Sequence, residues 1–167
     1  MDTGTSELSD DFYRILRDTD LRIKTSARAH WNTTNILESY ARVTTFLVIT
    51  GGGLVSLVVA IPIAFEEVYA GYNLMINLSI FFLGGLTSII STFQAIFRWT
   101  ERAQSHRIAA SHYTNARRRL EMMELNLPGS VEELTHILEE LTRLSDITPS
   151  VPEPIWRKAF RSVHSET

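Results

Sequence analysis

Two long stretches without basic residues lie in the middle of this sequence and constrain its fold more than any other feature. Residues 43–97 contain no lysine or arginine, and their only acidic residues are Glu66 and Glu67. The two glutamates separate uncharged runs of 23 and 30 residues, 43–65 and 68–97. A helix of about 23 residues spans roughly 34 Å, against a hydrocarbon thickness of about 30 Å. Because bulky apolar residues lie nearly all around each run, we expect two transmembrane helices rather than core helices of a soluble bundle.

Charges on either side of these runs predict the orientation. Basic residues flank the two runs, and we consider the three nearest to the start of the first run and the three nearest to the end of the second, whereas the connecting segment has none. They are Lys24, Arg28, Arg42, Arg98, Arg102 and Arg107. Basic flanks favour the cytosolic side, so we expect both termini in the cytosol and the loop acids Glu66 and Glu67 outside. A charged segment of 42 residues precedes the first run, which is therefore expected to remain as an anchor and not to be a cleaved signal peptide.

The expected fold class is an all-α membrane protein, a two-transmembrane helical hairpin whose long helices extend into a cytosolic helical bundle or coiled coil. A chain of 167 residues suits one domain. From Ser9, a candidate N-cap, no proline or glycine occurs before Gly51, so one helix is expected to continue into the first span. The expected parts are a cytosolic N-terminal helix (1–42), the first span (43–65), an extracytoplasmic loop (66–69), the second span (70–97), its cytosolic extension (98–127) and C-terminal cytosolic helices (130–167).

The cytosolic segments carry apolar stripes that call for helical partners. Residues after the second span follow a 4-3-4-3-4 spacing, which is a heptad seam: Ala109, Tyr113, Ala116, Leu120, Met123 and Leu127. "LPGS" predicts a turn, and Ser130 with Glu133 resembles a capping box for a further helix. The N-terminal helix has a modest stripe, Phe12, Leu16, Ile23, Ala27, Leu37 and Ala41. The seam fits a multi-subunit bundle or an internal pairing of helices, and the sequence leaves both open.

A repeated pentapeptide places glycine inside both apolar runs. "GGLVS" at 52–56 returns as "GGLTS" at 84–88, although glycine weakens a helix in water. In lipid, small residues let helices approach closely. Gly52, Ser56 and Ala60 form one such row, and Gly84, Ser88 and Thr92 form another. The rows are expected to face each other within one chain or to meet neighbouring subunits.

One face of the second span is small and polar, whereas the rest of that helix is bulky. Its members recur at helical spacing and are Asn73, Asn77, Gly84, Ser88, Ser91 and Ala95, with Thr92 beside them. Polar groups at bilayer depth are tolerated where they meet protein or water. Helix packing and an aqueous lining are both consistent with this face. Extending its register through Trp99, Arg102 and His106 to Ala109 predicts a single seam along one long helix.

No pattern of catalytic residues is present. The five histidines show no HExxH spacing and the chain has no cysteine, so neither a metal site nor a cofactor is expected. His30 beside Trp31 is expected to be a packed pair. Arg98, Arg102, Arg117, Arg118 and Arg119 are candidates for contact with an anion or a lipid headgroup, and pairing with the eight acids of residues 120–153 is the alternative for the last three.

The layout resembles the SLATT family of two-transmembrane effector domains from bacterial conflict systems. The similarity lies in "ARAHWNTTNILESYARVTTFLV", the short-looped pair of spans, "RWTERAQSHRIAASHYTNARRRLEMM" and the terminal "VPEPIW". The resemblance implies a homo-oligomeric, pore-forming or membrane-disrupting effector of the bacterial inner membrane that kills or arrests the cell in anti-phage defence. It also implies a trigger, either a nucleotide second messenger from a partner synthase or a sensor or other defence protein.

Two alternatives remain beside this non-enzymatic effector. The spans would serve only as an anchor if the chain were a scaffold that recruits a partner through its cytosolic helices. A uniporter-type cation channel would need a carboxylate filter, for which Glu66 and Glu67 are the available acids, but the tryptophan–aspartate signature of such channels is missing. The expected partners are the bilayer, further copies of the chain and a defence protein, and no nucleic acid is expected.

Overall fold

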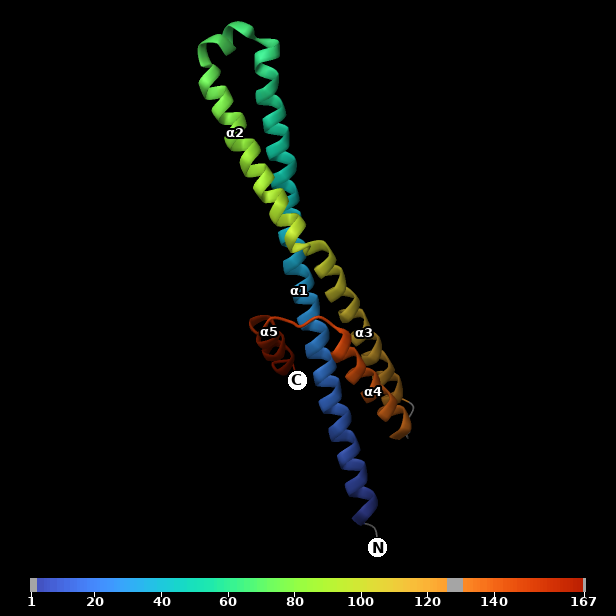
Figure 1. The fold of residues 1–167 in the computed structure, drawn as a ribbon. Helices are drawn as coiled ribbons and strands as arrows, with labels where there is room; N and C mark the ends of the chain where they lie inside the picture. Colours follow the sequence, from blue (N-terminus) through green and yellow to red (C-terminus); the bar gives the residue numbers. More distant parts are fainter. Residues whose placement is uncertain (1–2, 126–130, 167) are drawn as a thin grey trace. The chain divides into compact units, whose positions relative to one another are not determined.

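The computed structural model describes residues 3–125 and 131–166, and these residues form α-helices and no strand (Figure 1). The helices are α1 (Thr3–Ala64), α2 (Glu66–Phe97), α3 (Trp99–Leu125), α4 (Val131–Ile147) and α5 (Glu153–His164). The all-α prediction is therefore confirmed. The turn expected at 127–130 and the capping serine Ser130 lie outside the described residues.

The chain separates into two compact units, although the sequence favoured one domain. The central unit comprises residues 37–101, and the terminal unit comprises residues 1–36 together with residues 102–167. Helix α1 contributes to both, because it runs for 62 residues without interruption. The predicted continuous first helix is thus confirmed, and it begins at Thr3, before the expected N-cap Ser9.

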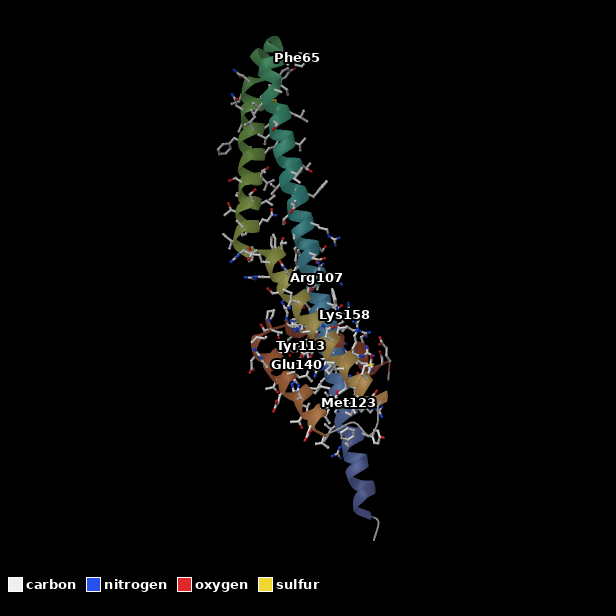
Figure 2. The ribbon with its side chains drawn as sticks, turned by 90° about the vertical axis from the view of Figure 1, so that its right-hand side faces the viewer. Phe65, Arg107, Tyr113, Met123, Glu140 and Lys158 are labelled. Carbon is white, nitrogen blue, oxygen red and sulfur yellow. The ribbon has the colours of Figure 1, made fainter. Side chains whose placement is uncertain are left out.

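Two helices of the chain are long and apolar enough to cross a membrane. The apolar windows lie on α1 and on the segment that includes α2, and none of either window is buried inside the chain. In the central unit these helices run side by side in opposite directions, joined at Phe65 (Figures 1 and 2). Their exposed phenylalanine, leucine and isoleucine side chains would meet lipid in a bilayer.

The connection between α1 and α2 is shorter than predicted. Only Phe65 is non-helical, with φ −140° and ψ 76°, and α2 begins at Glu66. The expected loop over 66–69 is therefore wrong, because these residues form the first turn of α2. The helix bends instead at Tyr72, whose φ of −127° and ψ of 19° interrupt the helical geometry directly after Gly71.

A helix break at Arg98 overturns the prediction of one long second helix. Arg98 takes the left-handed conformation with φ 48° and ψ 43°, and its N–H donates to the Gln94 carbonyl as α2 ends at Phe97. Helix α3 then starts at Trp99. This conformation usually calls for glycine or asparagine, so an arginine gave no sequence signal for it. The seam expected to run from Asn73 to Ala109 on one helix is therefore interrupted.

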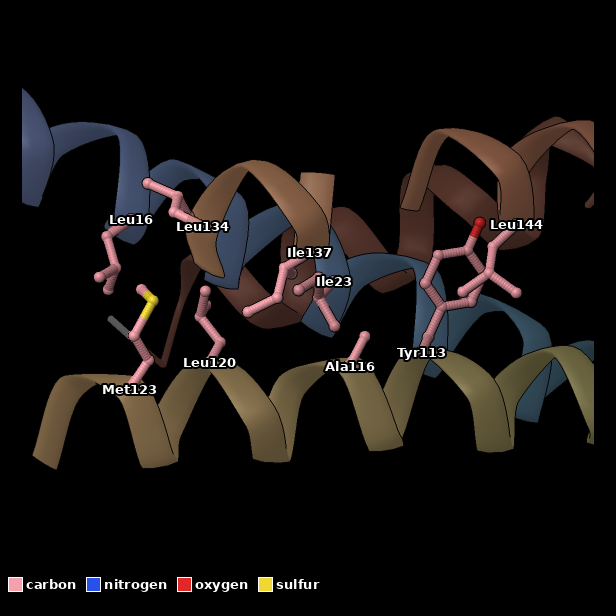
Figure 3. Close-up of a cluster of buried hydrophobic side chains, with 9 residues drawn as sticks. All are labelled: Leu16, Ile23, Tyr113, Ala116, Leu120, Met123, Leu134, Ile137 and Leu144. Carbon is pink, nitrogen blue, oxygen red and sulfur yellow. The ribbon is translucent and has the colours of Figure 1, made fainter. Parts of the chain in front are cut away.

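The core of the terminal unit is built by α1, α3 and α4 (Figure 3). All described members of the heptad seam are buried, namely Ala109, Tyr113, Ala116, Leu120 and Met123, and Leu127 lies outside the described residues. They pack with Leu16 and Ile23 of α1 and with Leu134, Ile137 and Leu144 of α4. The seam thus finds its partners inside the chain, which is the internal pairing that the sequence left open.

Charged contacts connect the helices of the terminal unit. Arg119 of α3 pairs with Glu140 of α4, as the opposite charges of these segments predicted. Arg28 of α1 binds Glu166 with two nitrogens at 2.7 and 3.1 Å and donates to the Ser162 hydroxyl at 2.8 Å. This contact holds α5 against α1, and the hydrogen bonds between the two side chains, with their opposite charges, raise the pKa of Arg28 and lower that of Glu166.

Candidate functional site

The contact between α1 and α2 in the central unit uses one regular stripe of α2. Its side chains are buried or half-buried and recur every three or four residues: Ile76, Ile80, Leu83, Thr87, Ile90 and Gln94. The Gln94 amide donates to the Thr45 hydroxyl of α1 at 2.9 Å. Gly51 of α1 lies against Thr87 so closely that a Cβ at Gly51 would overlap the Thr87 hydroxyl oxygen. The stripe therefore combines apolar packing, one polar bond and one close approach.

The small, polar face predicted on α2 lies beside this stripe and not on it. At 100° per residue its members lie between about 60° and 160° around the helix from the centre of the stripe, with Thr92 the farthest. Asn73, Asn77, Ser88, Thr92 and Ala95 are exposed, and Gly84 and Ser91 are half-buried. We call this set the polar face. Helix α1 covers the neighbouring stripe and leaves most of the polar face open.

The repeated pentapeptides at 52–56 and 84–88 do not contact each other between α1 and α2, which was one of the two expectations for them. A Cβ added at Gly52 or Gly84 would meet no atom within 4 Å among the described residues, and Ser56 and Ala60 are exposed. The glycine that allows the close approach is Gly51, which precedes the first pentapeptide. The rows Gly52–Ser56–Ala60 and Gly84–Ser88–Thr92 are therefore surfaces of the central unit, and the expectation that they face each other within one chain is wrong.

The predicted anion-contacting arginines fall into two groups. Three have acidic partners: Arg98 pairs with Glu101, Arg119 with Glu140, and Arg117 with Glu121 at 2.8 Å and Asp20 at 3.4 Å. Arg102 and Arg118 are exposed and have no partner within the described residues. Glu66 and Glu67 lie in the first turn of α2. The five arginines are thus dispersed over α3 and its start and do not form one patch.

A buried histidine pair in the terminal unit was missed by the sequence analysis. The Nδ1 atoms of His30 on α1 and His106 on α3 are 2.9 Å apart, and the Tyr113 ring stacks on His30 with centroids 5.6 Å apart. In this hydrogen bond one neutral imidazole donates its Nδ1–H and the other accepts it at Nδ1. Extending both stripes by one heptad would have found the pair, since His30 follows Ile23 and His106 precedes Tyr113 by seven residues.

Burial keeps this pair uncharged at neutral pH. Desolvation, and secondarily the neighbouring His106, lower the pKa of His30 to about 4. Desolvation also lowers the pKa of His106. Two imidazolium rings at this separation would repel each other, so the pair carries at most one positive charge. The pair therefore stabilises the packing of α1 against α3 while both rings are neutral, and protonation at low pH destabilises this contact.

A cleft of about 600 Å³ opens beside the histidine pair. Helices α1, α3 and α4 and the segment leading into α5 all line it. Its polar and aromatic lining residues include Arg22, His30, Tyr113 and Trp156. The volume lies within the 300–1,000 Å³ typical of small-molecule sites. No segment of the sequence marks this cleft, because its walls come from residues up to 137 positions apart.

No group of three or more histidine, cysteine or acidic side chains is placed to hold a metal ion within the part of the chain that the structure describes. Comparisons with protein-family models, with curated proteins and with solved structures found no match to this chain.

Proposed function

We propose that this protein is a non-enzymatic membrane effector that oligomerises through the polar face of α2 and forms a pore in, or disrupts, the membrane that holds it. In this proposal the central unit spans the bacterial inner membrane, and both termini are cytosolic. The cell is killed or arrested when a trigger acts on the terminal unit. The trigger is a nucleotide second messenger or a partner protein, as the resemblance to SLATT effectors implies.

The polar face is the observation that supports this proposal most. Amides and hydroxyls on a helix of membrane-spanning length are costly in lipid unless protein or water covers them. Within the described chain α1 covers the adjacent stripe, whereas Asn73, Ser88 and Thr92 stay exposed. The Thr92 hydroxyl already donates to the Ser88 carbonyl at 2.9 Å, and a second copy of the chain, or water in a passage between copies, would cover the remaining polar groups. Both solutions place α2 on the inner side of an assembly.

The distribution of basic residues and the packing of the heptad seam also support this proposal. The distribution of basic residues supports cytosolic termini. The internal use of the heptad seam leaves the polar face as the surface with the clearest need for a partner.

The test is leakage of ions and dye from liposomes that contain the purified protein, together with leakage from cells that express it. Ser88→Leu fills the polar face with a bulky side chain and should abolish leakage. Ser79→Leu is the matched control, because Ser79 is exposed on the same helix but lies about 140–180° around it from Ser88. Leakage should persist in that variant.

Three outcomes would count against the proposal. Liposomes that stay intact with and without an extract of phage-infected cells would exclude a pore. Equal toxicity of Ser88→Leu and wild type would remove the polar face from the mechanism. Full function after both spans are replaced by unrelated spans would show that the central unit is only an anchor.

A further inference from the structure

The cleft of the terminal unit carries a single charged side chain. Of the described residues that line it, Arg22 alone is charged at neutral pH, and none is an aspartate or glutamate. Arg22 is exposed and has no ion pair or hydrogen bond to another described residue through its guanidinium group. An unpaired guanidinium at the edge of a cleft without carboxylates attracts one anionic group and can bind it through two nitrogens.

A buried hydroxyl without a partner faces the same cleft. Tyr113 is only 7% exposed, yet its hydroxyl has no hydrogen bond to any described residue. The oxygen is nevertheless not sealed from solvent, since it is absent from the fully buried unpaired atoms, and the cleft is the space that Tyr113 lines. Figure 3 shows this hydroxyl projecting from α3 beside Leu144. Because this hydroxyl is open to the cleft, water or a ligand atom that occupies the cleft can take its hydrogen bond.

The other walls favour a flat ligand with an N–H group. The stacked rings of His30 and Tyr113 line the cleft, and Trp156 of α5 contributes a further ring to the lining. Thr142 and Ser145 of α4 already donate their protons to their own helix, to the Leu138 carbonyl at 2.9 Å and the Thr142 carbonyl at 2.7 Å. These two hydroxyls can therefore only accept a hydrogen bond from a ligand.

We infer that this cleft binds a small planar molecule that carries one carboxylate or phosphate group and at least one N–H donor. Arg22 binds the anionic group, and the ring lies among Tyr113, His30 and Trp156. The Tyr113 hydroxyl donates to the ligand, and the hydroxyls of Thr142 and Ser145 accept from its N–H. This site lies within the terminal unit and does not depend on whether the central unit forms a pore.

The binding test uses the full chain in lipid nanodiscs and equilibrium dialysis with two probes. Adenosine monophosphate supplies the ring, the amino group and a phosphate, and indole-3-acetate supplies the ring, the N–H and a carboxylate. Adenosine is the neutral comparison, and empty nanodiscs correct for partition into lipid. We expect at least one anionic probe to bind, and adenosine to bind about tenfold more weakly than adenosine monophosphate if the phosphate is the group recognised.

Variants assign the binding to the cleft. Arg22→Gln should weaken binding of the anionic probe about tenfold or more, because a charge-assisted bond is lost. Arg17→Gln is the matched control, since Arg17 is exposed on the same helix and does not line the cleft. Tyr113→Phe keeps the ring but removes the hydroxyl and should weaken binding several-fold. Circular dichroism and the melting temperature show whether each variant folds.

Four results would overturn the inference. They are failure of both anionic probes to bind at millimolar concentration, adenosine binding as tightly as a bound adenosine monophosphate, unchanged binding by a folded Arg22→Gln variant, and an equal loss in Arg17→Gln. Binding of adenosine monophosphate alone would assign the site to a phosphate, and binding of indole-3-acetate alone would assign it to a carboxylate. Either of these supports the inference.

Discussion

The close approach of Gly51 to Thr87 gives the sharpest prediction about the central unit. Substitution of Gly51 by alanine places a methyl group in steric overlap with the Thr87 hydroxyl oxygen and 3.4 Å from the Thr87 Cβ. Gly53 on the same helix is exposed, and a methyl group there meets no atom within 4 Å among the described residues. Gly53→Ala is therefore a matched control for every effect except the contact with Thr87.

Helix propensity and steric overlap together determine how the two variants differ in stability. Each substitution removes a glycine from a helix interior and gains about 1 kcal/mol of helix propensity, which cancels when the two variants are compared. Relief of the overlap at Gly51 requires Thr87 to leave its rotamer and its 2.7 Å hydrogen bond to the Leu83 carbonyl, or α1 and α2 to separate. Overpacking of this kind costs about 1–3 kcal/mol, so Gly51→Ala should be less stable than Gly53→Ala by about that amount.

The assay measures separation of α1 from α2 in mixed micelles as the fraction of sodium dodecyl sulfate rises. The chain has no cysteine, so Phe46→Cys and Phe93→Cys can carry spin labels at two exposed positions of the pair. The double variant Gly51→Ala/Thr87→Ala should regain most of the lost stability, because the overlapping oxygen is gone. If Gly51→Ala matched Gly53→Ala, or if Thr87→Ala brought no recovery, the close contact of α1 with α2 would be refuted.

Three further predictions concern the core, the histidine pair and the helix break. Leu120→Ala, at a fully buried position, should lower the free energy of unfolding of the terminal unit by about 2–5 kcal/mol in chemical denaturation, whereas Val131→Ala, at an exposed position, should change it by less than about 0.5 kcal/mol. Acidification from pH 6.5 to 4 should destabilise the terminal unit by up to about 3 kcal/mol, because His30 is protonated near pH 6.5 in the unfolded chain, whereas burial holds its pKa in the folded chain at about 4. The contribution of neutral His30 to stability is fully present above pH 6.5 and is lost as the pH falls to 4. The double variant His30→Phe/His106→Leu should therefore have a melting temperature that changes less across this range. Arg98→Gly should stabilise the chain by about 1 kcal/mol in thermal unfolding and Arg98→Val should destabilise it, because the left-handed conformation suits glycine and penalises a β-branched side chain.

The sequence predicted those features of the fold that depend on composition and periodicity. The uncharged runs identified α1 and α2, the absence of breakers identified the uninterrupted α1, and the heptad spacing identified the buried face of α3. Each of these is a local property, because an apolar stripe is buried whichever helix covers it. The opposite charges of α3 and α4 likewise predicted the pairing of Arg119 with Glu140.

Features that depend on a particular residue or on tertiary contact could not be predicted. The break at Arg98 has no glycine, asparagine or proline to announce it. The repeated pentapeptide predicted close helix contact at Gly52 and Gly84, whereas the glycine that lies against the other helix is Gly51, one position before the first pentapeptide. The cleft and the histidine pair arise only after α1, α3, α4 and α5 have assembled, and single-helix patterns do not indicate which helices will meet.

The internal packing of the heptad seam changes where an assembly of this protein has to form. Two surfaces were candidates for contact with other copies or within the chain, the seam of the cytosolic helices and the small rows of the spans. Leu120 and Met123 are buried against the chain's own helices, so exposing them to another copy would first require the terminal unit to open. The polar face of α2 needs no such opening. In the proposed assembly, Ser88→Leu should therefore reduce cross-linking between copies while the terminal unit keeps its melting temperature, and Leu120→Ala should lower that temperature while the folded fraction still associates.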